Sequence, residues 1–413
     1  MLSEIKSNLE APHELEKLYR SNKTQFTREF SMLYAESNSM PIMQFWHARL
    51  NFEKPEESLF ANKSELYFIC GAILLAGTIA KFPQIFSIDP EFFFSRNLSF
   101  IIFPILACYF AYRNSLSATK IGVLAALTFA ACLFINLLPI NTKSDTLILS
   151  CMHMMLFMWS VVGLAYVGGF KNIGGRLNYL KFNGDLVVIS ALLTIAGGIL
   201  TAITLGLFSL IGADITRFYF NYVIYFGMPA IPLLGAYLTQ TNTQLVDKVS
   251  PVIAKIFSPI VLVMLVCYLI AIVYSGKDPY TDREFLMMFN ILLIGVMALI
   301  FFAIAGNQGD RSKSSALVLL CLSVVTVLVN CVALSAIVFR ISEWGFTPNR
   351  TAILGANLLM LVNLILVCIQ LIKVNFNDAD EASVSTTIAH YLPVYFIWTI
   401  FITFVLPFLF GFK

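Results

Sequence analysis

Charged residues are scarce in this chain. Only 12% of its 413 residues are Asp, Glu, Lys or Arg, whereas 58% are hydrophobic. About a quarter of the residues in a soluble globular domain are charged, so this balance predicts an integral membrane protein. The formal net charge of +3 is also too small to indicate a nucleic-acid partner.

Paired metal-binding cysteines are absent. The eight cysteines all fall inside apolar stretches, and no two of them form a C-x-x-C pair. This pattern argues against a disulfide framework and against a zinc site, and it indicates small apolar side chains within helices. We therefore predict no metal and no cofactor. No G-x-S-x-G or H-E-x-x-H motif stands at a suitable place, so the sequence does not decide whether the protein is an enzyme.

A signal peptide is also lacking, because the first sixty residues are polar and contain no apolar core segment. We instead predict that residues 1–63 form a soluble helical leader. Proline at a first helical position and apolar residues at helical spacing place helices at Pro12–Arg20, Thr24–Tyr34 and Pro41–Leu50. Their apolar stripes comprise Phe26, Phe30 and Leu33 in one helix and Ile42, Phe45, Trp46 and Leu50 in another.

Residues 64–413 are dominated by long apolar stretches, most of which approach or exceed the roughly 20 residues that cross a bilayer. The sequence predicts an all-α, polytopic transmembrane helix bundle with about 11 spans. The second stretch is the weakest because it is short and contains Pro104; it either starts earlier, near Phe92, or is re-entrant. The stretches are Leu66–Phe82, Leu98–Tyr112, Ile121–Ile140, Thr146–Phe170, Leu186–Gly212, Phe218–Thr239, Pro251–Tyr274, Phe285–Gly306, Ser315–Phe339, Thr351–Ile372 and Tyr391–Phe412.

Carboxylates are missing from the interior of every apolar stretch. Proton- and sodium-coupled transporters often place them at mid-membrane, so their absence weighs against that class. The stretches contain amides instead, which either join helices or line a solute path. His153 stands among methionines, which suits either a packed imidazole or a soft-metal site. The amides are Asn136, Asn221, Asn290, Asn330, Asn357, Asn363 and Gln370.

A polar segment, R-I-S-E-W-G-F-T-P-N-R (residues 340–350), separates the ninth and tenth stretches. Gly345 suits a left-handed turn, and Thr347 before Pro348 predicts the N-cap and first residue of the next helix. Arg350 then lies in a first helical turn, where a cation is disfavoured. We expect Glu343, a lipid phosphate or a bound anion to compensate it.

This segment, between two apolar helices, resembles the R…YG-[LF]-T-x-N-R signature of domain-of-unknown-function family 4153, a family of polytopic bacterial membrane proteins. The stretches H-E-L-E-K-L-Y-R (His13–Arg20) and Q-F-W-H-A-R-L-N-F-E (Gln44–Glu53) are similar to the cytoplasmic leader of its Bacteroidota-type members. Trp344 departs from the more usual Tyr but stays aromatic. The resemblance implies a bacterial inner-membrane protein and carries no established activity.

Basic residues near the first stretch favour a cytoplasmic N-terminus. With eleven spans, the 340–350 segment and Lys413 then lie on the outer side. Charges gather in the predicted outer loops and suit recognition of an anion or a lipid headgroup, and solvated helix ends are the simpler explanation of the same charges. The candidate binding residues are Asp89, Glu91, Arg96, Arg217, Arg340, Glu343 and Arg350.

Three functions fit these features. The first is transport or permeation of a small or lipid-like anionic solute, favoured by many spans and short loops. The second is a membrane-embedded, lipid-handling enzyme, such as a transferase acting on a lipid carrier, with Asp89 and Glu91 in its first outer loop. The third is a membrane scaffold or sensor whose leader binds a protein partner. Membrane lipids are the expected partners in every case.

Overall fold

We analysed a computed structural model of the whole chain. It describes residues 2–9, 11–21, 23–36, 40–50, 63–141, 143–169, 172–211, 213–241, 249–275, 280, 283–306, 313–377 and 380–413. These residues form helices and turns and contain no strand. The chain divides into two compact units, Met1–Ala61 and Asn62–Lys413, which are considered separately. The predicted boundary after residue 63 adjoins residues 51–62, which lie outside the described residues.

The first unit is a small helical unit with a core of its own. Its helices are α1 (Leu2–Ser7), α2 (Pro12–Ser21), α3 (Lys23–Glu36) and α4 (Pro41–Leu50). Trp46 is buried among rings from α2 and α3, and the Arg49 guanidinium lies 4.6 Å from its ring centroid. Phe45 is 59% exposed, so the predicted apolar stripe of α4 was wrong at this position. The buried core residues are Ile5, Leu15, Phe26, Phe30, Leu33, Met43 and Trp46.

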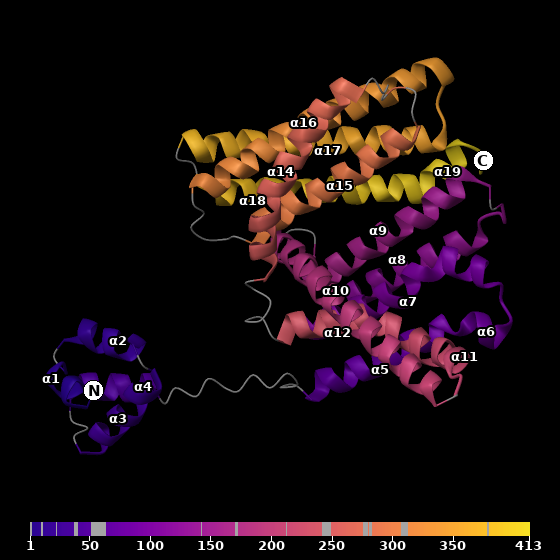
Figure 1. Cartoon of the computed structure of the whole chain (residues 1–413). Coiled ribbons are helices and arrows are strands. Elements are labelled where there is room, and N and C mark those ends of the chain that lie inside the picture. Colours follow the sequence, from indigo (N-terminus) through magenta and orange to yellow (C-terminus); the bar gives the residue numbers. More distant parts are fainter. Residues whose placement is uncertain are drawn as a thin grey trace. The chain divides into compact units, whose positions relative to one another are not determined.

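The second unit is a bundle of long apolar helices, drawn from purple to yellow in Figure 1. Eight of its described helices are long and apolar enough to cross a membrane, and three shorter apolar segments accompany them, at Ser64–Ala80, Ile256–Cys267 and Phe289–Ala305. The chain is thus an integral membrane protein, and the total of about eleven spans stays a prediction. The helices in the first half are α5 (Lys63–Ala80), α6 (Phe82–Phe86), α7 (Pro90–Arg113), α8 (Ala118–Leu137), α9 (Asp145–Val167), α10 (Ile173–Leu210), α11 (Thr216–Phe218), the π-helix η1 (Tyr219–Ile224) and α12 (Tyr225–Thr241).

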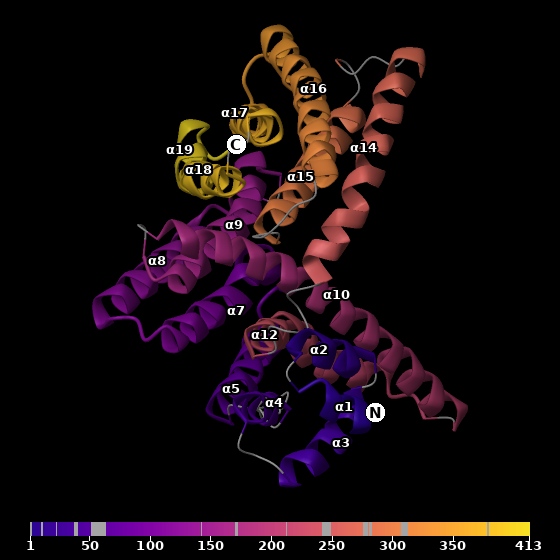
Figure 2. The ribbon, with the colours of Figure 1, turned by 90° about the vertical axis from the view of Figure 1, so that its left-hand side faces the viewer.

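The second half of the bundle packs around another core. Helices α16 and α17 pair closely, and α14, α15 and α18 pack against them (Figure 2). Helix α9 contacts both α7 and α18, and so links the two halves. The helices of this half are α14 (Val249–Ser275), α15 (Arg283–Gly306), α16 (Lys313–Trp344), α17 (Pro348–Phe376), α18 (Ala382–Ile400), the π-helix η2 (Phe401–Val405) and α19 (Leu406–Leu409).

Prolines inside two of these helices leave backbone carbonyls without their usual partners. In a regular helix the Ala389 carbonyl would bond to the N–H of residue 393, and the Thr403 carbonyl to that of residue 407; both of those residues are proline. Arg176 donates to the Ala389 carbonyl at 3.0 Å, and Ser150 donates to the Thr403 carbonyl at 2.9 Å. Side chains from α10 and α9 thus donate hydrogen bonds to these two carbonyls, which the hydrocarbon of a membrane cannot do.

Candidate functional site

The first candidate residues lie where α7 begins. Asp89 is the N-cap, and its carboxylate accepts the N–H of Glu91 at 3.2 Å. Pro90 occupies the first helical position, where its missing N–H costs nothing. The weakest predicted span is therefore a continuous 24-residue helix that starts before Phe92 and passes through Pro104.

Arg96 lies inside the bundle, 3% exposed, two turns further along α7. Its Nη1 donates to the carbonyls of Ile135 and Leu138 at 2.6 and 2.9 Å, and its Nη2 donates to the carbonyl of Pro139 at 3.1 Å. These carbonyls end α8, where a helix carries partial negative charge. The cation therefore caps a neighbouring helix, and only part of its donor capacity remains for a ligand.

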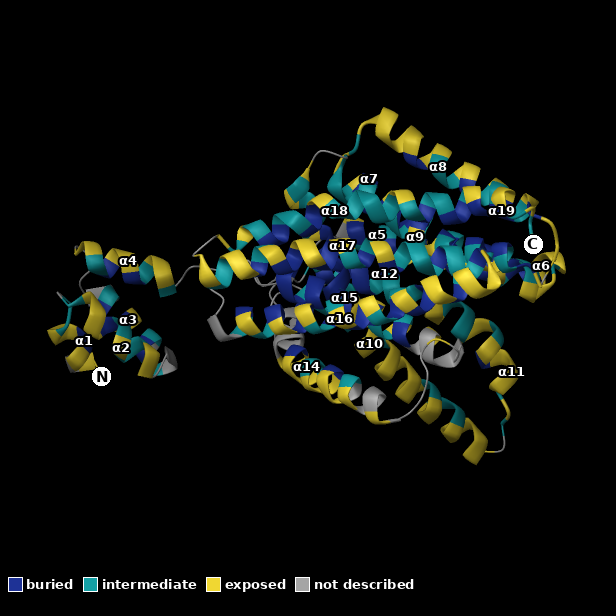
Figure 3. Cartoon of the chain, turned by 90° about the horizontal axis from the view of Figure 1, so that it is seen from above, coloured by how far each residue is buried: buried dark blue, intermediate teal, exposed yellow. Residues whose placement is uncertain are grey.

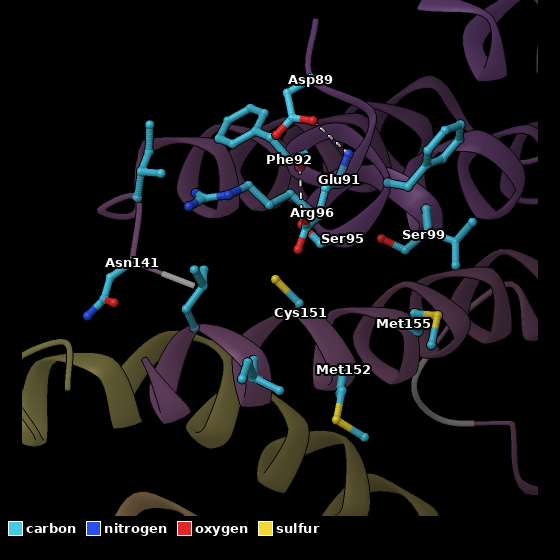
Figure 4. A pocket seen from close by; sticks show the side chains of 15 residues that line it. Asp89, Glu91, Phe92, Ser95, Arg96, Ser99, Asn141, Cys151, Met152 and Met155 are labelled. Atoms are coloured by element: carbon cyan, nitrogen blue, oxygen red, sulfur yellow. Dashed lines mark hydrogen bonds between the residues drawn. The ribbon is translucent and has the colours of Figure 1, made fainter. Parts of the chain in front are cut away.

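A cavity of about 490 Å³ opens between α7 and α9 at this end of the bundle (Figure 4). Its volume falls within the range of small-molecule sites. Three of the seven predicted binding residues, Asp89, Glu91 and Arg96, line it. The remaining lining residues are Phe92, Phe94, Ser95, Leu98, Ser99, Ile140, Asn141, Leu147, Ile148, Cys151, Met152 and Met155.

The cavity changes character along its length. Asp89 and Glu91 are exposed at the beginning of α7, whereas Leu98 and Met152 contribute apolar surface deeper in. The hydroxyl of Ser99, a residue that is 3% exposed, has no hydrogen-bond partner, and Figure 4 shows it directed between the two helices. The Cys151 thiol points into the same space from α9. The cavity therefore combines a charged mouth, an apolar flank and one unpartnered hydroxyl at depth.

The other predicted site residues lie elsewhere. Gly345 adopts φ +72°, and Thr347 caps α17 through the N–H of Arg350, as the sequence predicts. The Arg350 Nη1 donates to the carbonyls of Trp344 and Gly345 at 2.9 and 2.8 Å. The compensation expected from Glu343 or an external anion thus comes from the carbonyls that end α16.

Arg340 and Glu343 share the end of α16 with that turn. The Arg340 Nε donates to the Tyr280 carbonyl at 2.9 Å, and its guanidinium lies 5.9 Å from the Trp344 ring centroid. Glu343 is exposed and forms no ion pair within the described part of the chain. None of these residues lines the α7–α9 cavity, so one shared charged rim does not form there.

Arg217 is exposed on α11 and also lies outside the cavity. Beside it, Asp214 accepts the backbone N–H of Thr216 at 2.9 Å. Hydrogen bonds from the Thr216 side chain and backbone lower the pKa of Asp214. This acid thus serves the turn that begins α11.

Two acidic residues escaped the sequence reasoning. Glu65 is buried at the start of α5, where Arg113 donates to it at 2.7 Å and the Tyr109 hydroxyl donates at 3.2 Å. Asp185 is 6% exposed and lies twelve residues into α10. Both residues stand directly before a predicted apolar stretch, and α10 begins well before the stretch that starts at Leu186, so Asp185 lies within the helix although no carboxylate lies within the stretch. The only feature of the sequence that could have pointed to these two residues is their position directly before an apolar stretch.

The intramembrane amides mostly join helices. Asn97 and Asn136 exchange two hydrogen bonds, at 2.9 and 2.8 Å, between α7 and α8. The Asn363 amide donates to the Tyr395 hydroxyl at 3.0 Å. The His153 Nδ1 lies 2.9 Å from the Leu149 carbonyl of its own helix. Among the described residues, no three His, Cys, Asp or Glu side chains gather as a metal site requires.

Comparison with known proteins adds no further identification. No family model, curated protein or solved structure matches this chain. The resemblance to family 4153 therefore remains a prediction.

Proposed function

We propose that this integral membrane protein binds a lipid-like amphiphile in the α7–α9 cavity and moves it between the membrane surface and the interior. The observation that carries the proposal is the cavity itself, which joins exposed carboxylates at a helix end to an apolar flank. An amphiphile likewise has a polar headgroup at one end, followed by an apolar tail. A small ionic solute would leave the apolar flank without a partner.

The depth of the cavity supports this proposal. Asp89 and Ser99 both line it and are ten residues apart, which corresponds to about 15 Å along α7. The hydrocarbon core of a bilayer is about 30 Å thick, so a cavity of this depth would reach about halfway across. Its side is open to lipid, because Leu98 and Ile148 on its two walls are 46% and 48% exposed.

The test fills the cavity. Ser99→Phe should displace the ligand, whereas Ala125→Phe, on an exposed position of α8, is the matched control. We expect the first variant to lose lipid that co-purifies with the wild-type chain, measured by mass spectrometry, and to slow the transfer of a fluorescent lipid across proteoliposomes. Unchanged lipid content and transfer in a folded Ser99→Phe protein would exclude the cavity as the site.

A lipid-modifying enzyme is the second candidate. It is favoured by Glu91, an exposed carboxylate at the mouth that has no hydrogen-bond partner among the described residues and is free to act as a general base. If the protein is such an enzyme, Glu91→Gln should leave lipid retention intact and abolish conversion of the bound lipid. Lipid that passes through wild-type proteoliposomes chemically unchanged would contradict this alternative.

Three assignments belong to the same proposal. A bacterial inner-membrane location and membership of family 4153 are supported by the 340–350 segment, and a cytoplasmic N-terminus by the basic residues near the first apolar helix. A protein partner for the first unit is supported by its independent core.

A further inference from the structure

We infer that the α7–α9 cavity selects a zwitterionic glycerophospholipid whose headgroup carries a primary amine. The amine lies at Asp89 and Glu91, the phosphate at Arg96, and a glycerol ester carbonyl at Ser99. This inference rests on the proposed function and specifies its ligand. It also replaces the anionic solute that the sequence favoured.

The mouth of the cavity attracts a cation. Asp89 and Glu91 are both exposed there, and Arg96 is the cationic side chain among the lining residues. The formal charge of the three side chains is therefore negative, and the carbonyls around Arg96 further reduce its pull on an anion. A net-anionic headgroup would meet repulsion at this mouth, whereas an ammonium group would gain charge-assisted hydrogen bonds.

Arg96 still has room for one anionic group. The three carbonyls take three of its five N–H donors, and the other two have no acceptor within the described residues. Two donors suit one phosphate group, because a guanidinium binds phosphate through paired N–H groups. A singly charged phosphodiester therefore matches the number of donors that remain.

Ser99 provides the third contact. Its hydroxyl is buried, lacks a partner and faces the cavity between α7 and α9. A hydroxyl left unpaired in hydrocarbon costs free energy, so an acceptor on the ligand would be favoured there. An aminophospholipid carries an amine, a phosphate and an ester carbonyl, which provides one group for each of these three contacts.

The headgroup can be tested with three lipids that share the same acyl chains. Purified full-length protein would be titrated with phosphatidylethanolamine, phosphatidylglycerol and an ether-linked phosphatidylethanolamine, and binding measured by native mass spectrometry. We expect phosphatidylethanolamine to bind about tenfold more tightly than phosphatidylglycerol, the effect of one charge-assisted contact. Asp89→Asn with Glu91→Gln should abolish this preference, and the exposed control Glu343→Gln should keep it.

The ester contact has a separate test. Ser99→Ala should weaken binding of the ester-linked lipid and leave the ether-linked lipid unchanged. Soluble phosphoethanolamine, which shares the amine and phosphate, should not displace the lipid at equal concentration; displacement would make the ligand a soluble headgroup and overturn the inference.

The outcomes separate the two proposals. If Ser99→Phe releases lipid but the wild-type protein binds all headgroups equally, the inference fails and the lipid cavity stands. If Ser99→Phe releases no lipid, both fail.

Discussion

At the residue scale, three arginines of the bundle serve helix ends. Arg96 binds the carbonyls that end α8, Arg350 binds those that end α16, and Arg113 donates to the Gln240 carbonyl near the end of α12 at 3.0 Å. The last carbonyls of a helix lack partners within the helix, and a membrane offers no water to replace them. A guanidinium, with five donors, can satisfy several at once.

Removing one such arginine should lower the stability of the protein. Arg96→Ala leaves the carbonyls of Ile135, Leu138 and Pro139 without their donor. We expect it to lower the free energy of unfolding by about 2–4 kcal/mol, measured as a loss of thermal stability in detergent. Arg217→Ala is the matched control, since Arg217 is exposed and should leave stability within about 0.5 kcal/mol. Equal stability of the two variants would refute the capping role.

At this scale, the sequence could predict the features that depend on neighbouring residues, and it could not predict those that depend on tertiary contacts. Gly345 and Thr347 were predictable because a turn and a cap are decided within a few residues. The partner of Arg350 was not, because a backbone carbonyl has no signature in the sequence. The cavity could not be predicted either, because Asp89 and Ser99 on α7 face Cys151 only when α7 and α9 pack together.

At the element scale, the helices were predictable from apolar length, and their irregularities were not. Proline at positions 393 and 407 identifies the carbonyls that lack the partner of a regular helix. It could not tell us that Arg176 and Ser150 would supply new donors, because those lie more than 200 residues away in the chain. The repair is thus a tertiary feature that holds α18 and η2 against α10 and α9.

A double-mutant cycle tests this repair. Ser150→Ala should cost about 1–2 kcal/mol of unfolding free energy, because it leaves the buried Thr403 carbonyl without a donor. Pro407→Ala restores the missing N–H, so in that background the same serine substitution should cost less than half as much. Equal costs in both backgrounds would show that the serine does not compensate for the proline.

Close packing of α17 on α18 gives another prediction. A Cβ at Gly355 would lie 2.0 Å from Cη2 of Trp398, whereas a Cβ at Gly295 in α15 would meet no atom within 4 Å. Gly355→Ala should therefore destabilise the protein by about 1–3 kcal/mol. Gly295→Ala should be neutral or stabilising by up to about 1 kcal/mol, as expected for alanine in a helix. Thermal melts of both variants in the same detergent would decide, and a stable Gly355→Ala protein would contradict the packing.

At the scale of the whole molecule, the chain has two units with separate hydrophobic cores. The core of the first unit draws on residues up to Leu50, including Trp46 and Phe30. Its surface holds ion pairs such as Arg49 to Glu16 at 3.0 Å. Hydrogen bonding to Arg20 lowers the pKa of Glu16, so this contribution to stability is present above about pH 4.5 and is lost as the pH falls further.

Separate cores predict that the units can be separated. Deleting residues 1–61 should leave the melting temperature of the remaining chain within about 2 °C of the full-length value, because no side chain of the bundle core is removed. If the first unit binds a protein, partners that co-purify with the full chain should be lost from the truncated one. A truncated chain that aggregates or melts far earlier would show that the bundle depends on its first unit.

Helix α10 has a consequence for how this protein can evolve. Its buried residues all lie between Tyr179 and Asp185, while the side chains from Val187 to Leu210 are exposed or half-buried and include no charged residue (Figure 3). We expect a bilayer to surround these side chains, so their hydrophobicity should matter more than their shape. A saturation library across this segment should accept leucine, valine, isoleucine and phenylalanine interchangeably and reject lysine or aspartate, whereas the buried residues from Tyr179 to Asp185 should tolerate few replacements of either kind.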